Sequence, residues 1–347
     1  TNKPGESGAK FRDVASGGAK YNSSGVAIIG LADVIDSFCV IDALVFGGKM
    51  SAQELIAVLD ANFGRNPSVS NEAEAHNFVK NWLDRIRQLA GGSGTHPAAM
   101  TPQRLQECMR LIRLAPKYGA GVDETPGGIY NNAMAVKYTR LLTKMIQEVF
   151  FKYRTHRGGR YLTGYWSMTN HAGFGMLSRA TPNGRVNNAS FASGITPCPG
   201  IVKANGEPVM LLDHMLSVAS VDADTVQNGY TYNLSLTPRG KAYFDEDTEL
   251  FATHMKTFMD QDGVLVQLCV TSIEDFIAAN AAATAASREG AGEAEQKALA
   301  PYKDLMIRVA GYSAYYVTLS PLMRQEIIDR ANFDMKSGVE QHATTGA

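Results

Sequence analysis

The chain has 347 residues, of which 45% are hydrophobic and 19% are charged, and its formal net charge is −1. This is the composition of a globular protein with enough apolar residues for one large domain or two of ordinary size. The near-neutral charge argues against nucleic acid and anionic membrane surfaces as partners, and the apolar runs are too short and interrupted to span a bilayer.

The first 48 residues predict a loop followed by a buried helix. Residues 1–25 are polar and glycine-rich, and the chain begins at Thr1 without a methionine. We therefore expect it to be the C-terminal part of a longer polypeptide or one piece of a split one. Residues 25–48 combine an apolar run with helical spacing, which predicts a buried face. That face carries Ala32, Ile35, Phe38, Cys39 and Ala43.

Amphipathic patterns then predict four helices. Ser51 followed three residues later by Glu54 forms a capping box at the start of the first. Thr101 is placed as an N-cap, with Pro102 in the first turn. The four helices are expected at residues 51–63, 71–90, 101–115 and 131–153.

The second half of the chain predicts a mixture of strands and helices. Residues 158–206 are rich in Gly, Ser, Thr, Asn and Pro but too aromatic for a flexible linker, which indicates short strands and tight loops around a shared site. The helix-rich first half and the mixed second half favour an α/β fold, with a barrel or sheet whose loops build a pocket. The expected elements are a helix at 208–221, strands at 229–238 and 263–272, an alanine-rich helical segment at 274–306 interrupted near 288–294, and a helix capped by Ser320.

The four cysteines are widely spaced, and none has the spacing of a zinc ligand set. With no secretory segment, this usage favours a reducing cytoplasm. Cys39 and Cys108 fall on apolar helix faces, Cys198 lies in the dense central loop, and Cys269 lies in a strand pattern. None has a cationic neighbour in the sequence, so a structural role is the better interpretation for each.

Two places could supply acid–base or pocket groups. Trp166 and His171 lie in an aromatic and polar stretch, and a pocket role and a structural, hydrogen-bonded histidine are both open. Asp123 and Glu124 could act as carboxylates, although such a pair belongs more often to a turn. Gly311 interrupts an apolar, strand-like run, and taken alone it marks a bulge or a close backbone approach.

The surroundings of Gly311 change this interpretation. Residues 307–314, IRVAGYSA, resemble the glycyl radical signature of the pyruvate formate-lyase superfamily. The resemblance implies an α/β fold: residues 1–285 as the C-terminal part of a ten-stranded α/β barrel, and residues 286–347 as a glycyl radical domain. Further segments resemble the family in the same order, namely SGGAKYN (16–22), the helix at 30–48, PKYG (116–119), RATPNGR (179–185) and SGITPCPG (193–200).

The resemblance also implies a mechanism. Such enzymes store an unpaired electron on the α-carbon of a glycine, here Gly311, because a residue without a side chain can flatten at that carbon. A cysteine on a facing loop gives its hydrogen atom to this radical, and the resulting thiyl radical takes hydrogen from the substrate in a dry cavity. The resemblance implies support of the radical loop by Arg308, Tyr312 and Ser313, and substrate pocket residues Trp166, His171, Ile195 and Thr196.

The implied partners follow from the same resemblance. We expect no bound cofactor and no metal, because a radical-SAM activating enzyme installs the radical. A small organic substrate is expected, together with a homodimer, an upstream cysteine-loop segment, or both. The family's catalytic cysteine follows a glycine in a Gly-Cys loop that this sequence lacks, and Cys39 matches a helix position of the family instead.

The reaction is the least determined feature. The stretch 164–175 is aromatic with few acidic residues, and it is similar to fumarate-adding members such as alkyl- or benzylsuccinate synthases. The resemblance therefore favours addition of a hydrocarbon to fumarate. The alternatives are a formate acetyltransferase-, dehydratase- or decarboxylase-type enzyme, a non-catalytic radical-bearing subunit, or a binding protein in which Gly311 is only structural.

Overall fold

The computed structural model describes residues 15, 17–65, 101–122, 132–236, 248–309, 312–330, 332–334 and 338–339. The predicted helix at 71–90, the candidate carboxylates Asp123 and Glu124, and Gly311 lie outside these residues.

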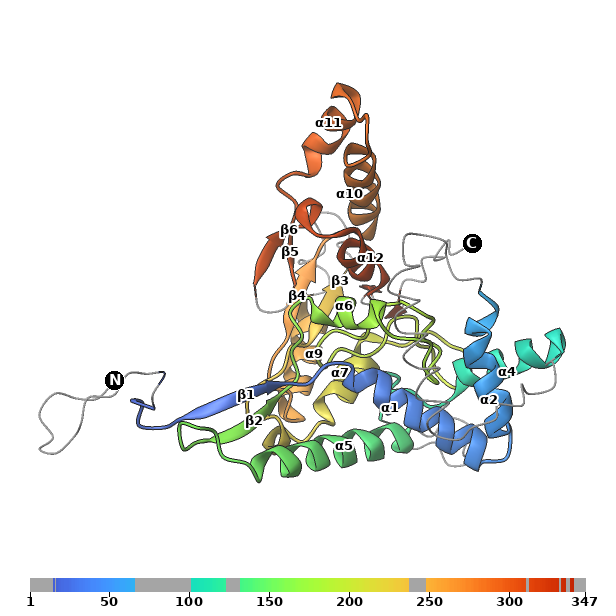
Figure 1. The fold of residues 1–347 in the computed structure, drawn as a ribbon, viewed down its shortest axis with the longest axis vertical. Helices are drawn as coiled ribbons and strands as arrows, with labels where there is room; N and C mark the ends of the chain where they lie inside the picture. The colour runs from blue at the N-terminus through green and yellow to red at the C-terminus, as the bar shows by residue number, and fades with distance from the viewer. Residues whose placement is uncertain are drawn as a thin grey trace, which may run out of the picture.

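Two parallel strands and two helices form one side of the molecule. Strand β1 (Ser23–Ala27) pairs with β2 (Arg160–Gly164), with Ser23 opposite Arg160. Helix α1 (Leu31–Val40) follows β1 directly, and the long helix α5 (Ala133–Phe151) packs on both α1 and β2, as Figure 1 shows. The helix that begins as α1 continues as a π-helical turn at Ile41–Phe46.

A small helical layer packs beside the end of α1. It contains α2 (Ala52–Asp60) and α4 (Pro102–Leu114). The predicted capping box is present, because Ser51 Oγ accepts from Glu54 N at 3.1 Å while Glu54 Oε2 accepts from Ser51 N at 2.8 Å. Thr101 Oγ1 accepts from the amide at N3 of α4 at 3.2 Å, so both predicted N-caps are confirmed.

A second sheet is centred on β3 (Asn233–Leu236). It runs parallel to β4 (Gln267–Val270) on one side and to β7 (Asn332–Asp334) on the other, and β8 (Gly338–Val339) adds antiparallel to β7. A parallel bridge between Tyr165 and Tyr230 lies between the end of β2 and the start of β3. The parallel strands and the helices between them confirm the predicted α/β class.

Several helices precede or connect these strands. Short 3-10 turns lie at Asn62–Gly64 beside α2, at Ala223–Thr225 before β3, and at Ala300–Tyr302 and Tyr316–Thr318 in the last part of the chain. The α-helices are α6 (Asn170–Met176), α7 (Leu211–Ala219) and α9 (Thr248–Asp260).

The last part of the chain forms a helical unit with a hairpin. Antiparallel strands β5 (Met306–Arg308) and β6 (Ser313–Tyr315) pack with α10 (Ile273–Ala286), α11 (Glu293–Leu299) and α12 (Pro321–Asp329), and α10 and α11 stand out from the body at the top of Figure 1. A shared core joins the hairpin, α10 and α12 to α6. Its buried members are Ala172, Phe276, Ala279, Ile307, Val309, Tyr316, Met323 and Ile327.

Several sequence predictions need correction or stay open. The prediction that Phe38 is buried is wrong, since its side chain is 41% exposed. It lies on the outer side of α1, where its ring stacks on that of Tyr138 with the ring centroids 5.3 Å apart. Helix α6 was not predicted, since its glycines hide the helical pattern. The domain boundary after residue 285 falls inside α10, which packs against α11 and α12, and it stays a prediction.

Candidate functional site

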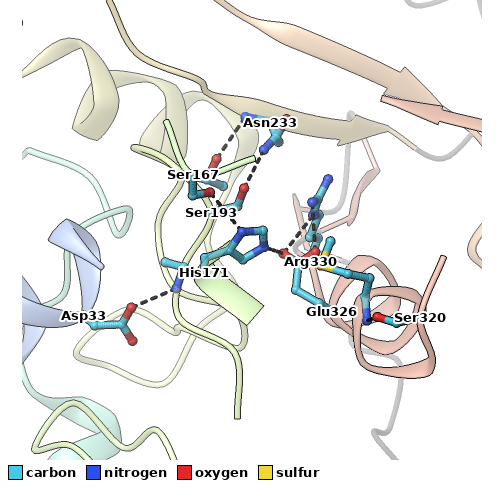
Figure 2. Close-up of polar contacts among 11 residues, drawn as sticks. Asp33, Ser167, His171, Ser193, Asn233, Ser320, Glu326 and Arg330 are labelled. Atoms are coloured by element: carbon cyan, nitrogen blue, oxygen red, sulfur yellow. Dashed lines mark hydrogen bonds and ion pairs between the residues drawn. The ribbon is translucent and has the colours of Figure 1, made fainter. Parts of the chain in front are cut away.

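A chain of polar contacts joins α6 to α12. Ser167 Oγ lies 2.9 Å from His171 Nδ1, and His171 Nε2 lies 3.3 Å from Glu326 Oε1. Arg330 donates two bonds to the same carboxylate, from Nε to Oε1 at 3.0 Å and from Nη2 to Oε2 at 2.8 Å. Figure 2 shows the histidine ring lying between the serine and the carboxylate, with Arg330 beyond it.

These side chains are removed from solvent, and their charges are matched. The side chain of His171 is 0% exposed, and those of Glu326 and Arg330 are 8% and 7% exposed. Burial raises the pKa of Glu326, but Arg330 and His171 outweigh it and hold that pKa at about 2. The carboxylate is therefore ionised at any pH near neutrality.

The local sequence explains how His171 is placed. Helix α6 packs closely against the following loop, because a side chain on Gly175 would come within 2.3 Å of the Ala189 carbonyl oxygen. The loop returns to α6 through a bond from Phe191 N to His171 O at 3.1 Å. The glycines of this stretch thus allow a buried, short helix with its histidine facing α12.

The segments that resemble conserved family motifs converge on helix α1. Asp33 accepts from Asn183 Nδ2 at 3.0 Å and from Ala192 N at 2.8 Å. One turn later, Asp36 accepts from Tyr118 N at 2.7 Å. Tyr118 and the stretch from Asn183 to Ala192, which are far apart in the sequence, are thereby held on a single helix.

Burial raises the pKa values of the acidic groups in the cluster around Asp33 and Asp36. It raises the pKa of Asp36 to about 7, although Lys117 opposes the shift. Burial also raises the pKa of Asp33 and of Cys198. Cys198 therefore stays a thiol, and Cys39, whose pKa is also raised by burial, lies in the core as predicted.

The four predicted pocket residues lie in one region but serve different contacts. His171 belongs to the chain of contacts described above, and Trp166 is half-buried against Gly164. Ile195 is fully buried, and its carbonyl accepts from Tyr118 Oη at 2.9 Å. Thr196 Oγ1 accepts from Asn233 N at 2.9 Å, so its hydroxyl holds the backbone of β3.

Three buried polar atoms in this region make no hydrogen bond within the described residues. They are the Tyr165 hydroxyl, Asn233 Oδ1 and His171 Nε2, whose 3.3 Å approach to Glu326 Oε1 is an ion-pair distance without hydrogen-bond geometry. The amide nitrogen of Asn233 donates to Ser193 Oγ at 3.1 Å, and Figure 2 shows this pair beside Ser167 and His171. The region thus contains both polar groups that are hydrogen-bonded and buried polar atoms that could still bond to a ligand or a water molecule.

The predicted radical-loop residues lie on the β5–β6 hairpin. Arg308 Nη1 donates to Ser313 Oγ at 3.3 Å on its exposed side. Val309 N donates to Tyr312 O at 3.0 Å, directly beside the paired strands. Ile307 and Val309 point into the core shared with α6, so the hairpin is anchored from beneath.

Sequence reasoning missed Glu326, Arg330, Asp33 and Asp36. The two residues on α12 are four apart, a spacing that usually marks a solvent-exposed ion pair. For Asp33 and Asp36 a signal was present, since both lie inside the apolar helix LADVIDSFCV at the spacing of its buried face. No group of three His, Cys, Asp or Glu side chains in the described ranges could hold a metal ion, and none of the helices described is long and apolar enough to cross a membrane.

Comparisons with known proteins agree with this architecture. The profile of the family "Pyruvate formate lyase-like" matches residues 7–175. An isethionate sulfite-lyase from Oleidesulfovibrio alaskensis is 26% identical over 309 residues, which is 88% of this chain and 29% of that protein. The probable dehydratase YbiW from Escherichia coli is 25% identical and covers 92% of this chain and 32% of its own length.

Solved structures show the same fold. The B12-independent glycerol dehydratase from Clostridium butyricum superimposes with a TM-score of 0.65 at 24% identity, over 92% of this chain and 32% of that one. A glycyl radical enzyme from Archaeoglobus fulgidus gives 0.63 at 24% identity, also over 92% and 32%. The chain therefore spans about a third of the length of these relatives. It is similar to pyruvate formate-lyase-like proteins over residues 7–175, and it has the α/β barrel fold of glycyl radical enzymes.

Proposed function

We propose that this chain is the radical-bearing part of a glycyl radical enzyme and that Gly311 stores the radical. The observation that carries the proposal is the signature IRVAGYSA, whose described residues form an anchored hairpin in a chain with the fold of glycyl radical enzymes. A radical-SAM activating enzyme would remove one hydrogen atom from the Gly311 α-carbon.

The proposed turnover is a relay of hydrogen atoms. The glycyl radical takes the hydrogen of a cysteine S–H, which restores Gly311 and leaves a thiyl radical. The thiyl radical takes a hydrogen atom from a substrate C–H, and the product radical later takes it back. None of the four cysteines follows a glycine, so we propose that a polypeptide matching the remaining length of the relatives supplies the thiol.

The reaction supported best is elimination from a small organic substrate. The relatives named above are a dehydratase and a sulfite-lyase, and they favour the lyase alternative over fumarate addition. In this reaction the substrate radical loses a leaving group, water or sulfite, from the neighbouring carbon. The product radical then recovers hydrogen from the thiol.

One observation keeps fumarate addition as a second candidate. The side chains that precede and follow His171 on its own segment include Trp166 and Phe174 but no carboxylate. The carboxylate that does reach His171, on Glu326, is already paired with Arg330. A segment of this kind suits an apolar substrate as well as a diol.

The storage role is tested with Gly311→Ala. After anaerobic activation, the unchanged chain is expected to give a doublet in electron paramagnetic resonance and to break near Gly311 in air. The variant should give neither. Gly292→Ala is the matched control, because Gly292 has an extended backbone and an added Cβ would meet only Glu295 Oε2 at 3.5 Å, so this variant should keep both behaviours. A doublet of normal intensity in Gly311→Ala would place the radical elsewhere.

The reaction class is tested after the thiol-bearing polypeptide is added. Consumption of a vicinal diol with release of an aldehyde would support elimination. Formation of a substituted succinate from fumarate and a hydrocarbon would support the second candidate and exclude the first as the main activity.

A further inference from the structure

The pair formed by Glu326 and Arg330 is placed where stability alone does not require it. Two oppositely charged residues four apart on a helix can pair at the surface, where desolvation costs little. Here both side chains are more than nine-tenths buried. A buried ion pair is costly to desolvate and is often no more stable than apolar residues of the same volume. Its position therefore points to a role in specifying one arrangement.

His171, the third residue of this contact, shows that the arrangement in question is the position of α12 against α6. The carboxylate reaches across from α12 to His171 Nε2 on α6. A ring with its proton on Nε2 leaves Nδ1 to accept from Ser167 Oγ and places the Nε2–H 3.3 Å from the carboxylate, a close electrostatic contact that lacks hydrogen-bond geometry. At 3.3 Å the contact with Glu326 is longer than an ordinary N–H···O bond, so a small displacement of α12 would break it.

Helix α12 is held on its other side by a different arginine. Arg324 Nε donates to Asn280 Oδ1 on α10 at 2.9 Å, and Arg324 Nη1 donates to the Leu319 carbonyl oxygen at 2.7 Å. The bond to Asn280 attaches helix α12 to α10. The contact between His171 and Glu326 is a polar link, here called the tie, between the unit of α10 and α12 and helix α6 in the body of the molecule.

The hairpin lies on the same core as this tie. Val309 beside the hairpin turn and Ile327, which follows Glu326 on α12, belong to one buried cluster with Ala172, which follows His171 on α6. Separation of α6 from α12 would open that cluster and release the hairpin. We propose that Glu326 and Arg330 act as positioning residues that hold His171, and that this contact keeps the β5–β6 hairpin docked against α6.

Docking of the hairpin matters for the proposed function because the hairpin would carry the radical on Gly311, and only this part of the inference rests on that function. The docking itself is a property of the unactivated chain. It can be measured without a radical, a substrate or a second polypeptide.

The test is amide hydrogen exchange of the whole chain with Glu326→Gln. The amides of Val309 and Tyr316 are bonded to the carbonyl oxygens of Tyr312 and Leu305 in the docked hairpin. We expect these amides to exchange at least tenfold faster in the variant, because the neutral amide holds His171 and Arg330 less strongly. Amides of β1 and β2 should keep their rates.

Two further variants keep the test decisive. Gln325→Ala is the matched control, since Gln325 is the exposed neighbour on α12 and its loss should leave the hairpin rates unchanged. His171→Phe removes the other end of the tie while Glu326 keeps Arg330, and it decides the question if Glu326→Gln fails to fold. The double variant, with both Glu326→Gln and His171→Phe, should exchange its hairpin amides little faster than the faster of the two single variants.

Two outcomes would overturn the tie. One is hairpin exchange at the unchanged rate in both single variants. The other is an acceleration that reaches β1 and β2 equally, which would mean general loss of stability. If the unchanged chain never gives an electron paramagnetic resonance signal, the radical function fails while the exchange result still stands.

Discussion

At the scale of single residues, the unusual feature is the number of ionisable groups that the fold buries. Asp33 and Asp36 project from α1 into the core, where backbone and side-chain donors receive them. Such groups are tolerated because each accepts at least one hydrogen bond, yet Asp36 Oδ2 has no partner among the described residues, and a group in which burial dominates responds to pH.

Asp36 makes a prediction about pH. Its folded pKa of about 7 lies above the model-compound value of 3.8, so the folded state binds the extra proton between these values. The free energy of unfolding should therefore fall as pH rises through this window, by up to about 4 kcal/mol at about 1.4 kcal/mol per pKa unit. Asp36→Asn keeps an acceptor for Tyr118 N but does not titrate.

Urea unfolding at pH 5 and pH 8 checks this. The unchanged chain should lose more stability between the two values than Asp36→Asn, and the variant should be the more stable protein at pH 8. Asp60→Asn, on the exposed side of α2, serves as the control. Equal slopes for the unchanged chain and Asp36→Asn would show that Asp36 is ionised throughout.

At the scale of elements, local signals and tertiary contacts cooperate at α2. Glu54 completes the capping box and also receives Arg104 from α4, with Arg104 Nε 2.6 Å from its Oε1. The bond from Arg104 first, and the Ser51 amide second, hold the pKa of Glu54 at about 2. The start of one helix is thus tied to the next.

Removal of the cap should weaken this layer measurably. Ser51→Ala deletes the acceptor of the Glu54 amide and is expected to lower the free energy of unfolding by about 1 kcal/mol. Gln53→Ala, on the exposed face of the same turn, should change it by less than about 0.5 kcal/mol. If the two variants are equally stable by urea unfolding, the cap contributes nothing beyond helix propensity.

At the scale of the whole molecule, the end of the chain returns to the sheet. Strand β7 lies beside β3, and Phe333 is fully buried with its ring 4.9 Å from that of His214. Since β3 also pairs with β4, residues near the C-terminus complete a core begun a hundred residues earlier.

Phe333→Ala should therefore destabilise the chain as a whole. Loss of a fully buried ring is expected to lower the free energy of unfolding by about 3–5 kcal/mol, measured by urea unfolding. Phe46→Ala is the comparison, because Phe46 is 81% exposed and its loss should cost less than about 0.5 kcal/mol. A small effect of Phe333→Ala would mean that β7 docks without supporting the core.

The elements that sequence reasoning predicted are those with local signals. The caps at Ser51, Thr101 and Ser320 and the strands at β3 and β4 were all placed correctly. Helix α6 was missed because its two glycines and its histidine give no amphipathic period. Phe38 was misplaced because periodicity cannot show that a neighbouring helix offers a stacking partner at the surface.

The sequence alone determined the family resemblance, the α/β class and Gly311 as the candidate radical store, because these depend on residue identity and short-range order. Only the tertiary structure decided that Glu326 lies beside His171 and that the segments 116–119 and 179–185 meet on α1. A charge pattern along one helix says nothing of which neighbour it will face. That choice is made by packing, which balances the cost of desolvation against contacts between residues far apart in the chain.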